Sequence, residues 1–300
     1  MHIASRDEII LFQERGFAIL KNAIPKDLLS YFKATLERLV DIFFEKHLEH
    51  SDNKKPTLSC DEKIIALKNK NPDYVSIIQR IISRTPEFFS LSSCIDTMPL
   101  MRAIYGLDDK APVYIINNGV VFTCPNDSHN KAISNFETGW HNDVFYTIPQ
   151  SRFWQVWVPL LHHATTEIGT LIVCPGSHKD GIGKQGIDIA ADYNNRYFID
   201  PNSLSKYSPE SIEVELGDIF IFDSRLIHKS GVNTSNNVRC SMLGAYHDAL
   251  SNNFLPISFE YKYYKKTPEG YFYEIFGDEN ARKIMFDDIA SVDLSFKNGV

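Results

Sequence analysis

Residues 136–146 read Phe-Glu-Thr-Gly-Trp-His-Asn-Asp-Val-Phe-Tyr, so that an imidazole and a carboxylate stand two positions apart. On an extended segment, residues i and i+2 project to the same face, and the side chains of His141 and Asp143 can therefore converge on one metal ion. Trp140, Phe145 and Tyr146 supply an apolar shell, which fixes ligand geometry and limits the access of water. The segment predicts a metal site mounted on a β-sheet.

One more neutral imidazole would complete a set of two histidines and one carboxylate, which leaves coordination positions open and is typical of non-haem Fe(II) oxygenases. His228 is the best-placed histidine, because residues 219–228 read as a buried strand that delivers it at its end. His162 and His163 precede a turn and read as surface residues, and His247 is a weaker candidate for the rim of a pocket.

A second His-x-Asp triplet, at residues 178–180, has the same spacing, so spacing alone does not separate the two. It lies between Pro-Gly-Ser and a glycine, which predicts a solvated turn, and Lys179 places a cation between the two would-be ligands. We therefore expect the first triplet to bind the metal. The alternative for the first triplet is a hydrogen-bonded pair at the end of a strand.

The hydropathy pattern predicts a mainly β fold with α elaboration. Residues 1–112 are mostly helical, with helices expected at 6–15, 28–48, 61–68, 74–83 and 97–105 and one strand at 17–20. Residues 113–248 favour short strands at 113–116, 120–122, 152–161, 170–174, 211–214, 219–222 and 238–246. Such strands, separated by turns, predict a double-stranded β-helix, a jelly roll of the cupin-like kind, behind N-terminal helices.

We expect one domain over residues 1–300, consisting of the helical part, the jelly-roll core and a tail at 249–300 with a helix at 279–285. Residues 183–207 form a long polar insertion that we expect to project over one mouth of the core. The oligomeric state cannot be read from this pattern.

The composition excludes several classes of protein. A net charge of -7 and a pI near 5.8, without a stripe of Lys and Arg, argue against a nucleic-acid partner. The five cysteines are odd in number and form no C-x-x-C pair, so we expect buried reduced thiols rather than disulfides or a zinc site. We find neither a signal peptide nor a stretch long enough to span a bilayer, which predicts a cytoplasmic protein without a membrane partner.

Four segments carry a resemblance to a known family. Residues 228–239 resemble the H-x-S-x-x-N-x-S-x-x-x-R pattern of the phytanoyl-CoA dioxygenase family of Fe(II)/2-oxoglutarate oxygenases, and residues 169–178 resemble its G-x-L-x-V-x-P-G-S-H segment. Residues 140–143 resemble its W-H-x-D, and the opening strand at 16–20, followed by a long helix, is also similar. The segments keep the family's order, but residues 60–105 and everything after Asp248 match no motif.

The resemblance implies that His141, Asp143 and His228 bind Fe(II) and that Arg239 forms a salt bridge with the distal carboxylate of 2-oxoglutarate. The chemistry of arginine supports this role independently, because its fork binds a carboxylate bidentately and stays charged when desolvated. Ser241 faces the same way as Arg239 and could donate a second hydrogen bond. Trp157 would line the binding site of the cosubstrate, or it would be a core tryptophan without a role in binding.

The implied reaction consumes 2-oxoglutarate and O2, releases succinate and CO2, and hydroxylates an unactivated C–H bond of a small or medium organic metabolite. The retained carboxylate disfavours halogenation. Rival interpretations are a cupin-like isomerase or epimerase, which would not need an arginine in this place, and a catalytically inactive metal-binding protein. Candidate substrate residues, each also readable as a core residue, are Asn117, Phe145, Tyr146, Arg152 and Trp154.

Overall fold

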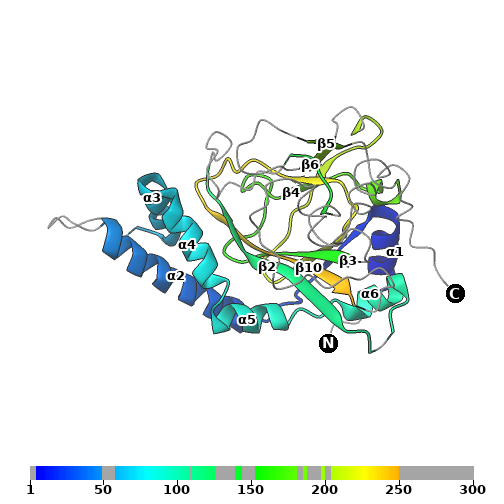
Figure 1. Ribbon diagram of the computed structural model, residues 1–300, viewed down its shortest axis with the longest axis horizontal. Helices are drawn as coiled ribbons and strands as arrows, with labels where there is room; N and C mark the ends of the chain where they lie inside the picture. The colour runs from blue at the N-terminus through cyan, green and yellow to red at the C-terminus, as the bar shows by residue number, and fades with distance from the viewer. Residues whose placement is uncertain are drawn as a thin grey trace, which may run out of the picture.

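Two antiparallel sheets form the core of the computed structural model, which describes residues 5–48, 58–108, 110–125, 139–143, 153–180, 185–187, 197–199 and 204–249 (Figure 1). The larger sheet has five strands in the order β1-β8-β3-β10-β2, and the smaller has three in the order β7-β4-β9. A further antiparallel pair joins β5 to β6. The strands are β1 (Phe17–Leu20), β2 (Val113–Thr123), β3 (Phe153–Pro159), β4 (Leu171–Val173), β5 (Gln185–Ile187), β6 (Tyr197–Ile199), β7 (Glu210–Ser211), β8 (Ile219–Asp223), β9 (His228–Ser230) and β10 (Arg239–Asp248).

The larger sheet is buried on both faces. Phe220 and Phe222 of β8 point between the sheets, where they join a cluster with Trp157 of β3. Ile219 and Ile221 alternate with them and join a second cluster on the outer face. Because successive residues of a strand face opposite sides, burial of both faces explains why these strands read as continuous apolar runs.

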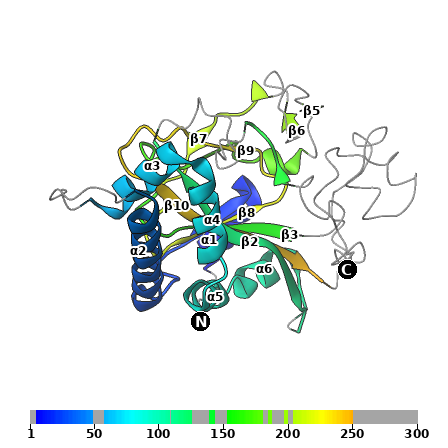
Figure 2. The same ribbon diagram turned by 60° about the vertical axis from the view of Figure 1, so that its left-hand side comes forward.

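Helices cover the outer face of the larger sheet. They are α1 (Arg6–Arg15), α2 (Lys26–Leu48), α3 (Cys60–Lys70), α4 (Pro72–Ile82), α5 (Pro86–Ser93) and α6 (Met98–Tyr105). Figures 1 and 2 show α2, α3 and α4 together on one side of the sheets. Phe32 and Leu36 of α2, Ile64 of α3 and Ile78 of α4 belong to the same hydrophobic cluster as Val156 of β3, so the helical part and the jelly roll share a core.

Helix α1 is delimited by its own sequence. Ser5 and Glu8 form a reciprocal capping box at the start, and Gly16 ends the helix with a left-handed φ of 86°. A Cβ atom at Gly16 would also lie only 2.5 Å from Nδ1 of His178, so the position tolerates no side chain for two separate reasons. Strand β1 begins at the next residue and pairs with β8.

The predicted jelly roll with N-terminal helices is confirmed, and the structure differs from the prediction in several elements. The helix α5, which Thr85 caps, was not predicted. The two strands expected at 113–116 and 120–122 are one strand, β2, whose register against β10 shifts between Leu243 and Ala245. An irregularity within a continuous strand thus replaces the expected break.

The strand expected to carry His228 at its end is also divided in two. Strand β8 ends at Asp223, whose carboxylate accepts hydrogen bonds from the backbone N–H of Arg225 at 2.9 Å and from its Nε at 2.9 Å. The chain turns there, and His228 begins β9 in the other sheet. An aspartate that bonds the backbone two residues later is a turn signal, which the apolar run concealed.

The helix predicted at 279–285 lies outside the described residues, and so does most of the insertion at 183–207. All five cysteines are free thiols, as predicted, and three of them are buried. Among the helices that the structure describes, none is long and apolar enough to cross a membrane. The assignment of residues 1–300 to one domain stays a prediction.

Candidate metal and cosubstrate site

The two sheets bring His141, Asp143 and His228 together. His141 and His228 form an antiparallel bridge, with backbone N–O distances of 3.0 and 2.9 Å in its two hydrogen bonds. The backbone N–H of Asp143 donates to the carbonyl of Ser224 at 2.9 Å, within the turn that follows β8. The backbone of the segment at 139–143 is thus fixed against the turn between the sheets on both sides of Asn142.

Both imidazoles are oriented by carbonyl groups. Nδ1 of His141 lies 2.7 Å from the carbonyl oxygen of Gly139, and Nδ1 of His228 lies 2.9 Å from that of Leu226. A carbonyl oxygen only accepts hydrogen bonds, so each Nδ1 carries the proton and each Nε2 carries the lone pair. The neutral imidazoles therefore have the tautomer that a metal requires.

The Nε2 atoms of both histidines face the carboxylate of Asp143. Nε2 of His141 lies 3.7 Å from Oδ1 of Asp143, and Nε2 of His228 lies 3.5 Å from its Oδ2. One donor atom from each of the three residues lies within 4.8 Å of the other two. Two imidazole nitrogens and one carboxylate oxygen at these separations can bind a single divalent ion and leave its other positions open.

The triad is desolvated. His141, Asp143 and His228 are 5%, 7% and 5% exposed, and Oδ2 of Asp143 is buried without a hydrogen-bond partner. Burial raises the pKa of Asp143, and the neighbouring His228 and Gln155 side chains offset this only in part. An anionic carboxylate in such a place is unfavourable unless a cation binds it, and the donor set therefore fits an iron ion.

Arg239 begins β10 and is 4% exposed. Its guanidinium donates to the carbonyl of Gly169, to Oγ1 of Thr123 at 2.8 Å and to Oγ of Ser230 at 3.4 Å. These neutral acceptors set its direction without neutralising its charge. A buried guanidinium with a fixed direction suits recognition of a carboxylate.

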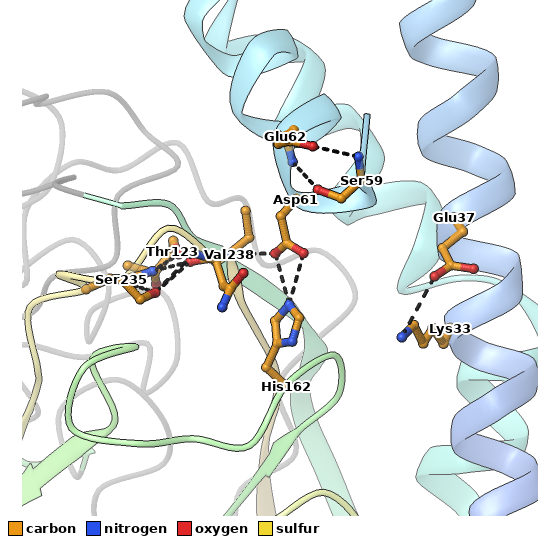
Figure 3. Close-up of polar contacts among 11 residues, drawn as sticks. Lys33, Glu37, Ser59, Asp61, Glu62, Thr123, His162, Ser235 and Val238 are labelled. Atoms are coloured by element: carbon orange, nitrogen blue, oxygen red, sulfur yellow. Dashed lines mark hydrogen bonds and ion pairs between the residues drawn. The ribbon is translucent and has the colours of Figure 1, made fainter. Parts of the chain in front are cut away.

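The loop between β9 and β10 supports the arginine. The amide nitrogen of Asn233 donates to the carbonyl of Thr123 at 3.0 Å and to that of Asn237 at 2.7 Å, while its amide oxygen accepts from the Ser235 hydroxyl at 2.7 Å (Figure 3). Hydrogen bonds within residues 228–239 thus stabilise the loop, and the hydrogen bond to Thr123 attaches the loop to β2. This explains in physical terms why it carries Asn and Ser at those positions.

The other predicted site residues fall into three groups. Ser241 and Trp157 are buried and lie on the interior side of the larger sheet, like Arg239. Trp154 points to the opposite face of β3, where its indole donates to Thr97 at 3.0 Å, so the structure does not bring it to the triad. Asn117 lies in β2 but its side chain is outside the described residues, as are Phe145, Tyr146 and Arg152.

One residue beside the triad, Gln155, escaped the sequence analysis, and His247 lies elsewhere than expected. Gln155 is 4% exposed, interacts with Asp143 and leaves its amide oxygen buried without a partner. A polar residue two positions before Trp157 in an apolar strand could have indicated it. His247, expected at a rim, is instead fully buried and stacks on Phe153 with ring centroids 4.4 Å apart. Burial lowers the pKa of His247 to about 3.

The second His-x-Asp triplet is organised differently, and the expectation of a solvated turn was wrong for its histidine. His178 is 6% exposed in a short 3-10 helix, packs against Gly16 and has its pKa lowered by burial. Asp180 lies on the surface, where it accepts from the Tyr207 hydroxyl at 2.6 Å and pairs with Lys206 at 3.0 Å. The two side chains separate instead of converging.

Comparison with known proteins agrees with this geometry. A profile of the phytanoyl-CoA dioxygenase (PhyH) family matches residues 12–241. The chain is 21% identical to the peroxisomal phytanoyl-CoA dioxygenase of Rattus norvegicus over 79% of its own length and 67% of the relative's. It is 24% identical to the 1-deoxypentalenic acid 11-beta-hydroxylase of Streptomyces exfoliatus over 75% of its own length and 74% of the relative's.

Solved structures share the fold at low sequence identity. EctD from S. alaskensis, with bound Fe, has a TM-score of 0.53 at 17% identity, covering 87% of this chain and 83% of that one. EvdO2 from Micromonospora carbonacea var. aurantiaca, complexed with 2-oxoglutarate, has a TM-score of 0.52 at 17% identity, covering 83% and 92%. With the family profile spanning most of the sequence, the chain belongs to the phytanoyl-CoA dioxygenase family of iron- and 2-oxoglutarate-dependent dioxygenases.

Proposed function

We propose that His141, Asp143 and His228 hold the iron of this enzyme. The observation that carries the assignment is the convergence of two Nε2 atoms and one unpaired carboxylate oxygen, all buried, within 4.8 Å of one another. The carbonyl groups that hold each Nδ1 would keep both lone pairs directed at the ion before it binds. Because the ligand side chains are already oriented, they lose less conformational entropy when the ion binds.

We further propose that Arg239 binds the distal carboxylate of 2-oxoglutarate. Ser241 donates a second hydrogen bond to this carboxylate, and Trp157 lines the cosubstrate site. Arg239 and Ser241 lie on the same face of β10, and Leu243, which pairs with Trp157, follows on that face. When bound, iron with 2-oxoglutarate and O2 supplies the oxidising power for attack on an unactivated C–H bond. The protein orients the cosubstrate and excludes water.

We propose hydroxylation of a small or medium organic metabolite as the reaction. The relative from Streptomyces exfoliatus is named 1-deoxypentalenic acid 11-beta-hydroxylase, which supports a hydroxylation of an organic acid as the kind of reaction. Within the sheet, the interior residues beyond Gln155 are Phe153 and His247, whose phenyl and imidazole rings stack and suit the carbon skeleton of such a substrate.

Succinate formation tests the proposal. Purified protein is supplied with Fe(II), ascorbate, O2 and 2-oxoglutarate, with and without a pooled metabolite extract, and succinate is measured. We expect the extract to stimulate succinate formation and the His228→Ala variant to abolish the stimulation. Stimulation that persists in His228→Ala would refute the iron assignment. Iron binding without any succinate would favour a catalytically inactive protein.

A further inference from the structure

Asp61 lies in the part of the chain where no family motif was found, yet its side chain reaches Val238, directly before β10 (Figure 3). It stands in the first turn of α3, between Ser59 and Glu62, which form the capping box of this helix. It is 8% exposed. The positive end of the helix dipole favours a carboxylate at this place.

The Asp61 carboxylate joins three elements. Its Oδ1 accepts the backbone N–H of Val238 at 2.6 Å, and Nε2 of His162 lies 3.0 Å from each of its oxygens. His162 follows the end of β3, whereas Val238 directly precedes β10. Helix α3 is therefore attached to the neighbouring ends of two adjacent strands of the larger sheet.

The carboxylate stays charged in this environment. Burial alone would raise the pKa of Asp61, but the hydrogen bonds from His162 and from the N–H of Val238 outweigh burial and lower it. A charged acceptor makes hydrogen bonds about twice as strong as those of a neutral one. The contact with Val238 is thus a strong attachment rather than an incidental one.

The attachment bears directly on Arg239. Val238 is fully buried and is the residue before Arg239, while Asn233 holds the carbonyl of Asn237. That carbonyl and the N–H of Val238 belong to one peptide unit, which is therefore held at both of its polar atoms, by Asn233 from the β9–β10 loop and by Asp61 from α3. This peptide unit fixes the position at which the chain enters β10, and hence the backbone from which the side chain of Arg239 extends.

We propose that Asp61, oriented by His162, is a positioning residue for 2-oxoglutarate binding, acting through Val238 on Arg239. The inference rests on the proposed role of Arg239. Because Asp61 belongs to α3, the proposal gives the N-terminal helices a role in 2-oxoglutarate binding in addition to covering the larger sheet.

The test measures the dissociation constants of 2-oxoglutarate and of Fe(II) for the full chain, without O2 and well below the melting temperature. We expect Asp61→Ala to bind 2-oxoglutarate about tenfold more weakly and Asp61→Asn, which keeps one oxygen for Val238, about threefold more weakly. Fe(II) binding stays unchanged in both. If Asp61→Ala does not fold, Asp61→Asn carries the test.

Ile64→Val is the matched control, because Ile64 lies on the same helix, is fully buried and belongs to the hydrophobic core. It should lower the melting temperature and leave the affinity for 2-oxoglutarate unchanged. An equal loss of affinity in Ile64→Val would reduce the role of Asp61 to general stability and overturn the proposal.

A double-mutant cycle tests whether Asp61 acts on 2-oxoglutarate binding through Arg239. In an Arg239→Ala background, Asp61→Ala should cause no further loss of 2-oxoglutarate affinity, because the group that it positions is gone. Additive losses would overturn the proposal. Wild-type affinity in Asp61→Ala, with weak binding in Arg239→Ala, would overturn it and leave the proposed function intact. Wild-type affinity in Arg239→Ala would overturn both.

Discussion

The two His-x-Asp triplets of this chain have the same spacing and different structures. In the first, His141 and Asp143 are both buried, and both lie beside His228, to which His141 is bridged through its backbone. In the second, His178 is buried under Gly16, whereas Asp180 lies on the surface with Lys206. The comparison teaches that spacing permits convergence, but the elements on which the residues lie decide whether it occurs.

The largest expected effect separates the two carboxylates. Asp143→Asn should weaken Fe(II) binding and succinate formation by at least about a hundredfold, because the charged ligand is lost. Asp180→Asn is the matched control. It removes an exposed ion pair and should change the free energy of unfolding by less than about 0.5 kcal/mol, with activity intact. Comparable losses of iron binding in both variants would contradict the claim that only the first triplet binds the metal.

A smaller effect tests the structural role of His178. Gly16→Ala should lower the free energy of unfolding by about 3 kcal/mol, because it adds a clash with the imidazole to the strain of a positive φ. Gly106→Ala is the control, since Gly106 also has a positive φ but no neighbour within 4 Å of its added Cβ. It should cost about 1 kcal/mol. Denaturant unfolding measures both, and equal costs would contradict the packing of His178 on Gly16.

The smallest expected effect is on the pH dependence of stability. Burial lowers the pKa of His178 in the folded protein, so the unfolded chain binds more protons as the pH falls below about 6.5. Stability should therefore decrease with falling pH in that window. The metal-free His178→Gln variant should lose less stability between about pH 6.5 and 5 than the metal-free wild type. Identical pH profiles would indicate that His178 is not buried as a neutral group.

Most of the fold could be predicted from the sequence because local signals and burial agree there. Helix α1 has its capping box and terminal glycine, and β3 and β8 are apolar because both faces are covered. The turn after β8 was missed, since Asp223 and Arg225 stand within an apolar run. The single strand β2 was missed because its irregularity depends on the partner strand.

The convergence of His141, Asp143 and His228 and the burial of Arg239 were predictable from residue type and spacing, whereas their roles in binding stay proposals. The candidate site was not predictable where contacts join distant segments. Nothing in the sequence near Asp61 indicates that its carboxylate meets Val238, and Thr123 reaches Arg239 only because β2 pairs with β10. The face on which Trp154 lies also depended on the register of β3, which the sequence leaves open.

Anomalous diffraction at the iron edge, from crystals prepared with Fe(II) in the absence of O2, tests the central claim most directly. We expect one strong peak within bonding distance of Nε2 of His141, a carboxylate oxygen of Asp143 and Nε2 of His228. A peak beside His178 or Asp180, or no iron near the buried triad in crystals that otherwise bind it, would contradict the assignment.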